Sequence, residues 1–115
     1  MYILAINPGA TSTKIAVYQG NRSVFLKTIR HENGELDGFE RTTDQLAYRR
    51  KLVLDEVESN HIPYESVGVI IARGGLIQPI ESGVYEVNAA MIADLQEGVM
   101  GDHASNLGGL IAHSL

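Results

Sequence analysis

The chain has 115 residues, of which 44% are hydrophobic and 20% are charged, and this composition suits one small globular domain. The net charge is -5 and no basic patch stands out, which argues against nucleic acid as a partner. The absence of cysteine excludes a disulfide framework and a cysteine-based zinc site. The first residues form a short strand-like run without a positive leader, so we expect no signal peptide, no membrane span and a cytoplasmic location.

Two short apolar runs near the start of the chain, residues 2–6 and 15–18, flank a segment rich in turn-forming residues. Short apolar runs with β-branched residues, bounded by turn residues, predict the two strands of a hairpin. The first run does not alternate with polar residues. We therefore expect both of its faces to be covered, as in the middle of a sheet.

The segment between these strands holds a glycine, a proline, three hydroxyl side chains and a lysine. Its candidate phosphate-binding residues are Asn7, Gly9, Thr11, Ser12, Thr13 and Lys14. A tight turn can present backbone N–H groups and hydroxyls to phosphate oxygens, while the lysine offsets the phosphate charge. The segment is not a Walker A loop, because a strand follows the lysine where that motif requires a helix. On spacing alone, an ordinary hairpin turn is the slightly better interpretation.

The next part of the chain predicts a turn at residues 19–22 and a third strand at residues 23–29. On that strand Val24 and Leu26 share one face, and Phe25 and Ile29 the other. Residues 31–41 are polar and predict a solvated connection, with His31 as a surface residue.

A helix is predicted to begin at Thr42, which can form a capping box with Gln45. Its apolar stripe consists of Leu46, Val53, Leu54 and Val57. The charged side chains on its other faces predict a solvated surface; they are Arg49, Arg50, Lys51, Asp55, Glu56 and Glu58. Pro63 ends the helix, because proline disfavours helical geometry at the residue before it, and His61 is then a helix-terminus residue.

Residues 67–72 form the second nearly all-apolar run and predict a second central strand. A helical crossover would make it parallel to its neighbour. Arg73, Gly74 and Gly75 follow directly, at the end of the strand where such sheets bind ligands. Arginine can grip a carboxylate or a phosphate through two hydrogen bonds. A surface arginine beside a flexible turn is an equally good interpretation.

The remaining residues predict a loop at 76–83, a short edge strand at 84–87 and a helix at 89–97. Asn88 caps that helix, Gly98 stops it, and Met91, Ile92 and Leu95 face inward. Asp102, His103 and Ser105 lie too close in sequence for catalytic-triad geometry. His103 and Asn106 are weaker candidates for orienting a ligand. The final helix-like run, residues 107–115, ends while still apolar and uncapped, so we expect a fragment of a longer protein.

Several separated motifs together resemble the butyrate kinases of the acetokinase family. The resemblance begins with the run I-L-A-I-N-P-G-A-T-S-T-K-I-A-V-Y at residues 3–18. It continues, in the same order, with A-R-G-G-L at 72–76 and P-I at 79–80, then G-V-Y at 83–85, V-N at 87–88 and G-D-H-A-S-N-L-G at 101–108.

This resemblance implies an α/β fold of the RNase H-like, actin-like ATPase type, found in acetate and sugar kinases, Hsp70 and actin. Such proteins have duplicated domains of mixed five-stranded sheet with helices and bind nucleotide between them. Residues 1–115 would form the N-terminal part of the first domain, with the second domain absent. The implied activity is reversible phosphoryl transfer from ATP, with Mg²⁺, to a short-chain carboxylate such as butyrate, giving an acyl phosphate and ADP.

In that reaction the first turn would hold phosphate or a metal-bound water, and Arg73, Gly74, Gly75, His103 and Asn106 would line the carboxylate site. The family's catalytic groups would lie outside this chain, so we expect the fragment alone to be inactive. The resemblance also suggests a homo-oligomer for the complete protein.

Two departures from the family pattern stand out. Ala10 occupies a position where butyrate kinases commonly have serine, and Ile70 stands where acetate kinases place their carboxylate-binding arginine. Arg73 replaces the histidine of the acetate kinase motif and is a substitute candidate. A sugar-kinase-like protein and a non-catalytic nucleotide-binding module remain alternatives.

Overall fold

The computed structural model describes residues 1–32, 34–77 and 81–115. Its centre is a mixed sheet of four strands in the order β3-β2-β1-β4. The strands are β1 (Tyr2–Pro8), β2 (Ser12–Gln19), β3 (Arg22–Arg30) and β4 (Val67–Ala72). β1, β2 and β3 form antiparallel pairs in succession, and β4 is parallel to β1. The predicted hairpin, third strand and parallel crossover are all confirmed.

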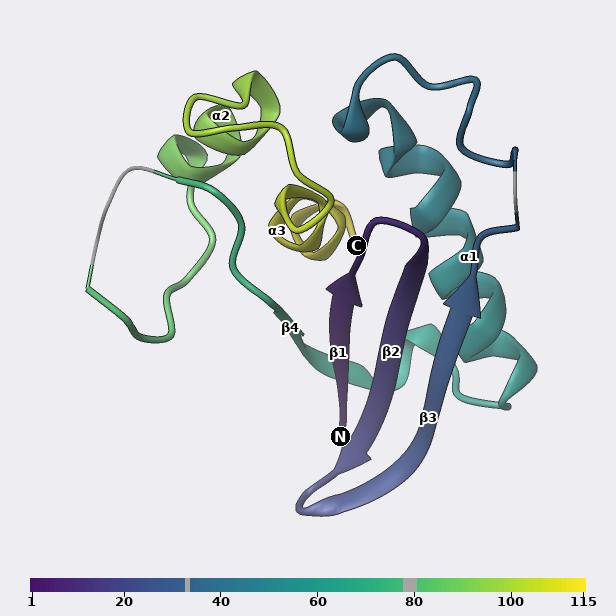
Figure 1. Ribbon diagram of the computed structural model, residues 1–115. Helices are drawn as coiled ribbons and strands as arrows, with labels where there is room; N and C mark the ends of the chain where they lie inside the picture. Colours follow the sequence, from purple (N-terminus) through teal and green to yellow (C-terminus); the bar gives the residue numbers. More distant parts are fainter. Residues whose placement is uncertain (33, 78–80) are drawn as a thin grey trace.

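The helices are α1 (Leu46–Ser59), α2 (Ala89–Glu97) and α3 (Asn106–Ser114), with short 3-10 turns at Thr42–Gln45 and Tyr64–Ser66. In Figure 1 the β1–β2 turn lies at the top of the sheet and the β2–β3 turn lies at the opposite end. The prediction of an edge strand at residues 84–87 is wrong, because these residues form no strand. The proline and isoleucine at 79–80, part of the family resemblance, lie outside the described residues.

The core lies between one face of the sheet and the helices α1 and α3. Leu4, Ile6, Ile15 and Val17 project from β1 and β2 and are almost completely buried. From the other side they meet Val53, Val57, Leu107 and Ile111 of the two helices. Strand alternation and helical spacing therefore place their apolar residues in one shared layer.

The opposite face of the sheet carries no helix of the described chain, which corrects two expectations. Ile3 and Ala5 of β1 are only half-buried, so β1 is covered fully on one face alone. β4 is the edge strand of the described sheet, with Val69 and Ile71 exposed. Apolar runs of this kind are typical of strands buried on both faces, but only a tertiary partner can cover the second face.

The start of α1 also differs from the expected capping box between Thr42 and Gln45. Arg41 is the cap of the preceding 3-10 turn, and its N–H donates to the Asp44 carboxylate at 3.1 Å. Gln45 instead occupies the cap position of α1, where its side chain is buried. Thr42 is the first residue inside this turn and not its cap, so the Asp44 carboxylate satisfies the backbone N–H of Arg41 in its place.

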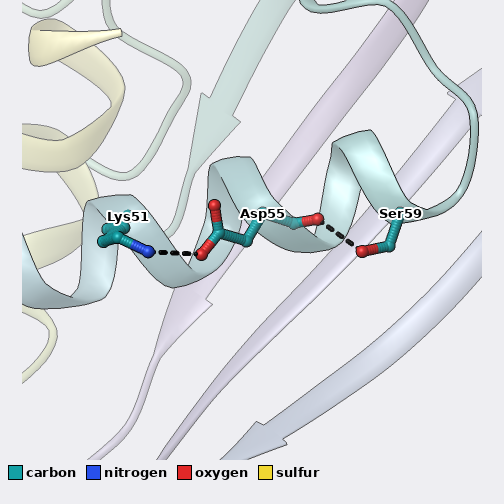
Figure 2. A network of polar contacts seen from close by, with 3 residues as sticks. All are labelled: Lys51, Asp55 and Ser59. Carbon is teal, nitrogen blue, oxygen red and sulfur yellow. Dashed lines mark hydrogen bonds and ion pairs between the residues drawn. The ribbon is translucent and has the colours of Figure 1, made fainter.

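The solvent face of α1 was predicted correctly in part. Lys51 Nζ lies 2.8 Å from Asp55 Oδ2, and Ser59 Oγ donates to the Asp55 carbonyl oxygen at 2.8 Å, as Figure 2 shows. Exposed pairs one helical turn apart contribute little to stability, about 0.3–0.5 kcal/mol. Arg49 contradicts the prediction, since it is 0% exposed and points toward the sheet.

The helix α2 agrees with its predicted boundaries. The Asn88 side chain accepts a hydrogen bond from Met91 N–H at 2.9 Å, and Gly98 ends the helix with a φ of 68°. Left-handed geometry of this kind favours glycine after a helix. No helix within the described ranges is long and apolar enough to cross a membrane.

Candidate phosphate and carboxylate site

A cavity of about 420 Å³ lies where the β1–β2 turn, the end of β4 and the segment before α3 meet. Parallel β1 and β4 end at this edge, as expected for a ligand site in such sheets. The lining residues come from three segments that are far apart in the sequence; they are Asn7, Pro8, Gly9, Ser12, Lys14, Arg73, Gly74, Leu76, His103 and Ser105.

The strand register places the polar side chains of this cavity side by side. Asn7 pairs with Lys14 across the antiparallel β1–β2 ladder. Ile6 pairs with Ala72 across the parallel ladder, and Arg73 N–H donates to the Ile6 carbonyl oxygen at 3.2 Å, so Arg73 comes next to Asn7. The edge of the sheet therefore presents an amide, an ammonium and a guanidinium group together.

Two candidates from the hairpin turn do not line this cavity. Thr11 is exposed outside it, and Thr13 is 0% exposed, with its hydroxyl directed into the protein. Alternation along β2 explains the difference, because residues 12 and 14 face one way and residue 13 the other.

Gly75 and Asn106 also lie apart from the lining and pack against each other. A Cβ atom on Gly75 would lie 2.8 Å from Asn106 Cα, so only glycine fits this contact. The buried Asn106 side chain accepts from Leu76 N–H at 2.8 Å and donates to the Gly101 carbonyl oxygen at 2.9 Å. In this structure Asn106 ties two loops together.

His103 lines the cavity and has a defined hydrogen-bond partner on one ring nitrogen. Ser105 N–H donates to His103 Nδ1 at 3.0 Å, and Ser105 Oγ lies 2.9 Å from the same nitrogen, which leaves Nε2 as the ring nitrogen without a partner among the described residues. Asp102 Oδ2 accepts from Thr42 N–H at 3.2 Å and does not hold the histidine. This arrangement is not a catalytic triad, in agreement with the prediction.

Helix α3 begins close to this cavity because Gly108 permits a tight approach to the sheet. A Cβ atom there would lie 2.8 Å from the Arg73 carbonyl oxygen and 3.5 Å from Pro8 Cδ. The first turn of the helix therefore abuts the ends of β4 and β1, near the lining residue Ser105.

Arg49 is a residue of this region that the sequence pattern did not reveal. From α1 it reaches under the β1–β2 turn, where Nη1 donates to the Gly9 carbonyl oxygen at 2.7 Å and to Thr13 Oγ1 at 3.2 Å. Thr13 Oγ1 in turn lies 2.9 Å from His31 Nε2. His31 is 7% exposed, which corrects its prediction as a surface residue.

The surroundings of His31, Arg49 and the neighbouring Glu35 shift the pKa values of these side chains. Burial lowers the pKa of His31 from its ordinary value of 6.5, and the positive charge of Arg49 lowers it further, against a smaller opposing effect of Glu35. Burial also lowers the pKa of Arg49. Glu35 itself accepts a hydrogen bond from Tyr48, which lowers the pKa of that carboxyl group.

The network predicts a loss of stability in mild acid. Because the folded protein disfavours protonated His31, the unfolded chain takes up its proton first. The stability that neutral His31 contributes to the folded protein is therefore present above pH 6.5 and lost as the pH falls below it. We expect the thermal midpoint of the complete protein that carries this chain to fall less from about pH 8 to about pH 5 in His31→Gln. His113→Gln, at an exposed position of α3, is the control, and an equal effect of both variants would contradict the prediction.

The donor set of the cavity fits an anion. Its polar lining consists of a lysine, an arginine, a histidine, two serines and an asparagine, with no carboxylate. Mg²⁺ prefers carboxylates, phosphate oxygens and water, so the cavity suits the phosphate groups that accompany the metal. Across the described residues, no group of three or more His, Cys, Asp or Glu side chains is placed to hold a metal ion.

The chain is an α/β protein with a cavity lined by hydrogen-bond donors at the carboxyl ends of its parallel strands. No protein-family model matches the chain. Curated relatives do match, and they confirm the resemblance to butyrate kinases. The chain is 45% identical over 113 residues to a probable butyrate kinase of Clostridium botulinum (strain Eklund 17B / Type B). It is 44% and 41% identical to butyrate kinases 1 and 2 of Clostridium acetobutylicum. Each alignment covers 98% of this chain and 32% of the relative, so the chain spans about a third of their length.

Proposed function

We propose that the protein carrying this chain transfers a phosphoryl group from ATP to a short-chain carboxylate, butyrate or a similar acid. The observation that carries this proposal is the meeting of Lys14, Ser12 and Arg73 around one cavity. The relatives that match nearly the whole chain are named butyrate kinases, which supports the same reaction. The likeness to these relatives also supports residues 1–115 as part of the first domain of an actin-like ATPase fold. Because the relatives are about three times as long, we propose that residues beyond this chain are needed for activity.

The proposed step joins a carboxylate oxygen to the γ-phosphorus of ATP and breaks the bond from that phosphorus to the β–γ bridging oxygen. The products are an acyl phosphate and ADP, and no proton is gained or lost. Catalysis of such a transfer consists mostly of positioning the reactants and neutralising phosphate charge. The step is reversible, because ATP and the acyl phosphate both carry an activated phosphoryl group.

Each lining side chain has a role in this proposal. Lys14, the Ser12 hydroxyl and the Asn7 amide would hold phosphate oxygens, since ammonium, hydroxyl and amide groups are all donors. Arg73 would bind the carboxylate and the developing acyl phosphate through its planar fork of donors. His103 would contribute one further hydrogen bond through Nε2. Mg²⁺ would neutralise charge on the phosphates of the nucleotide.

The chemistry also bears on location and assembly. We propose a cytoplasmic location, where ATP is plentiful, and a homo-oligomer for the complete protein.

The proposal is tested by incubating the complete protein with ATP, Mg²⁺ and a series of short carboxylates, then trapping acyl phosphate with hydroxylamine. We expect hydroxamate to form, with most product from butyrate or isobutyrate. Acids that differ by one methylene are separated by about 1–3 kcal/mol, so neighbouring acids should react more slowly rather than not at all. ATP binding without hydroxamate from any acid would instead favour a sugar-kinase-like or non-catalytic protein.

A further inference from the structure

A buried cation lies directly beneath the turn that lines the proposed phosphate site. The Arg49 side chain is 0% exposed, and its guanidinium contacts five oxygen atoms. These are the carbonyl oxygens of Gly9 at 2.7 Å, Ser12 at 3.2 Å and Ala10 at 3.5 Å, Thr13 Oγ1 at 3.2 Å, and Gln45 Oε1 at 2.9 Å.

These contacts determine how the turn presents its backbone. In a trans peptide the carbonyl points opposite to the N–H of the following residue. Carbonyls of Gly9 and Ala10 directed at Arg49 therefore leave the N–H groups of Ala10 and Thr11 directed away from it. Neither N–H has a backbone hydrogen-bond partner among the described residues. Arg49 thus holds the carbonyl oxygens of the turn on the inner side, while Gly9 and Ser12 of the same turn line the cavity.

The charge of Arg49 is not compensated by an anionic side chain. Throughout the described ranges the one ion pair is Lys51–Asp55, and every oxygen that Arg49 contacts is neutral. A buried charge held only by neutral dipoles keeps a strong field in its surroundings. Gly9 and Ser12 separate this charge from the cavity, because both contact Arg49 and both line the cavity.

We propose that Arg49 is the positioning residue of the phosphate site. Its guanidinium holds the carbonyls of the turn inward, and its charge gives the cavity a positive potential that a bound phosphate compensates. This inference rests on the proposed function in taking phosphate as the ligand, and it adds a residue that touches neither the nucleotide nor the acid.

Gln45 allows the charge to be tested without removing Arg49. In Gln45→Glu a carboxylate replaces the neutral oxygen 2.9 Å from Arg49 Nε, at nearly the same size. We expect this variant of the complete protein to fold and to bind ATP–Mg²⁺ about tenfold more weakly in calorimetric titration. Gln45→Met removes the same acceptor without adding charge, and its affinity should stay close to that of the unsubstituted protein.

Arg49→Met tests both parts of the inference together. We expect a loss of ATP–Mg²⁺ affinity of about a hundredfold, with partial recovery on adding ethylguanidinium but not ethylamine. Arg50→Met is the matched control, since the substitution removes an equal charge one residue away. Arg50 contacts Ser114 at the end of α3 and not the β1–β2 turn. A KM that rises for ATP but not for the carboxylate would separate positioning of the phosphate from general damage.

The outcomes distinguish this inference from the proposed function. Equal affinity of Gln45→Glu and Gln45→Met for ATP–Mg²⁺ would overturn the role of Arg49, even with acyl phosphate formation intact. If Arg49→Met does not fold, the Gln45 pair alone decides. Binding that depends on the Gln45 charge, without hydroxamate formation, would support the inference and reject the kinase reaction. No binding of ATP–Mg²⁺ by the unsubstituted protein would overturn both.

Discussion

Arg73→Met is expected to lower kcat/KM for the carboxylate by about 10²–10³-fold in the hydroxamate assay. Arg73 lines the cavity beside Lys14 and Gly74, at the end of the strand parallel to β1. Its fork of N–H donors is the group in this cavity best matched to two carboxylate oxygens. Loss of the guanidinium would raise the KM for the carboxylate more than the KM for ATP, because Lys14 and the turn still hold the phosphates.

Two variants make this result specific. Arg73→Lys keeps the charge but not the planar fork, so it should recover only part of the activity. Arg22→Met removes an arginine from the β2–β3 turn at the opposite end of the sheet, where it contacts Gln19, and it should leave activity unchanged. Equal activity of Arg73→Met and Arg22→Met would show that Arg73 does not bind the acid.

Asn106→Leu is expected to lower the free energy of unfolding by about 2–3 kcal/mol, near the lower limit for two unsatisfied groups because both are only partly buried. The substitution keeps the size of the side chain but removes both of its polar atoms. Leu76 N–H and the Gly101 carbonyl oxygen, now 2.8 and 2.9 Å from the amide, would lose their partner at a partly buried place. Each unsatisfied buried backbone group costs about 1–3 kcal/mol.

The effect should be visible both globally and locally in the complete protein. We expect a lower thermal midpoint and faster amide hydrogen exchange in the loop that contains Leu76 and in the segment before α3. Asn60→Leu is the control, because Asn60 is exposed and its side-chain amide donates to Glu56 of the preceding helix. A role of Asn106 in contacting the acid would instead raise the KM for the carboxylate without changing the thermal midpoint.

Some of the candidate site residues proposed from the sequence line the cavity, and others do not. Local patterns identified Asn7, Ser12 and Lys14 as turn donors and Arg73 as a strand-end cation, since turn chemistry and strand ends can be read from neighbouring residues. Thr13 was predicted as part of the turn, but it lies in β2, where alternation directs its side chain into the protein. Asn106 was a candidate ligand contact, and the structure shows it joining two loops.

Local sequence patterns are enough to predict the hairpin, the third strand, the helical crossover to a parallel strand, and the capped helix after Asn88. Each depends on residues within one turn or a few positions of one another. The tertiary structure shows that Arg49 and His31 are buried, although both look like surface residues in a polar pattern. It also left one face of β1 and β4 open, although their apolar runs are typical of strands covered on both sides. Burial depends on which distant segment packs against a residue, and that contact is decided by the fold as a whole.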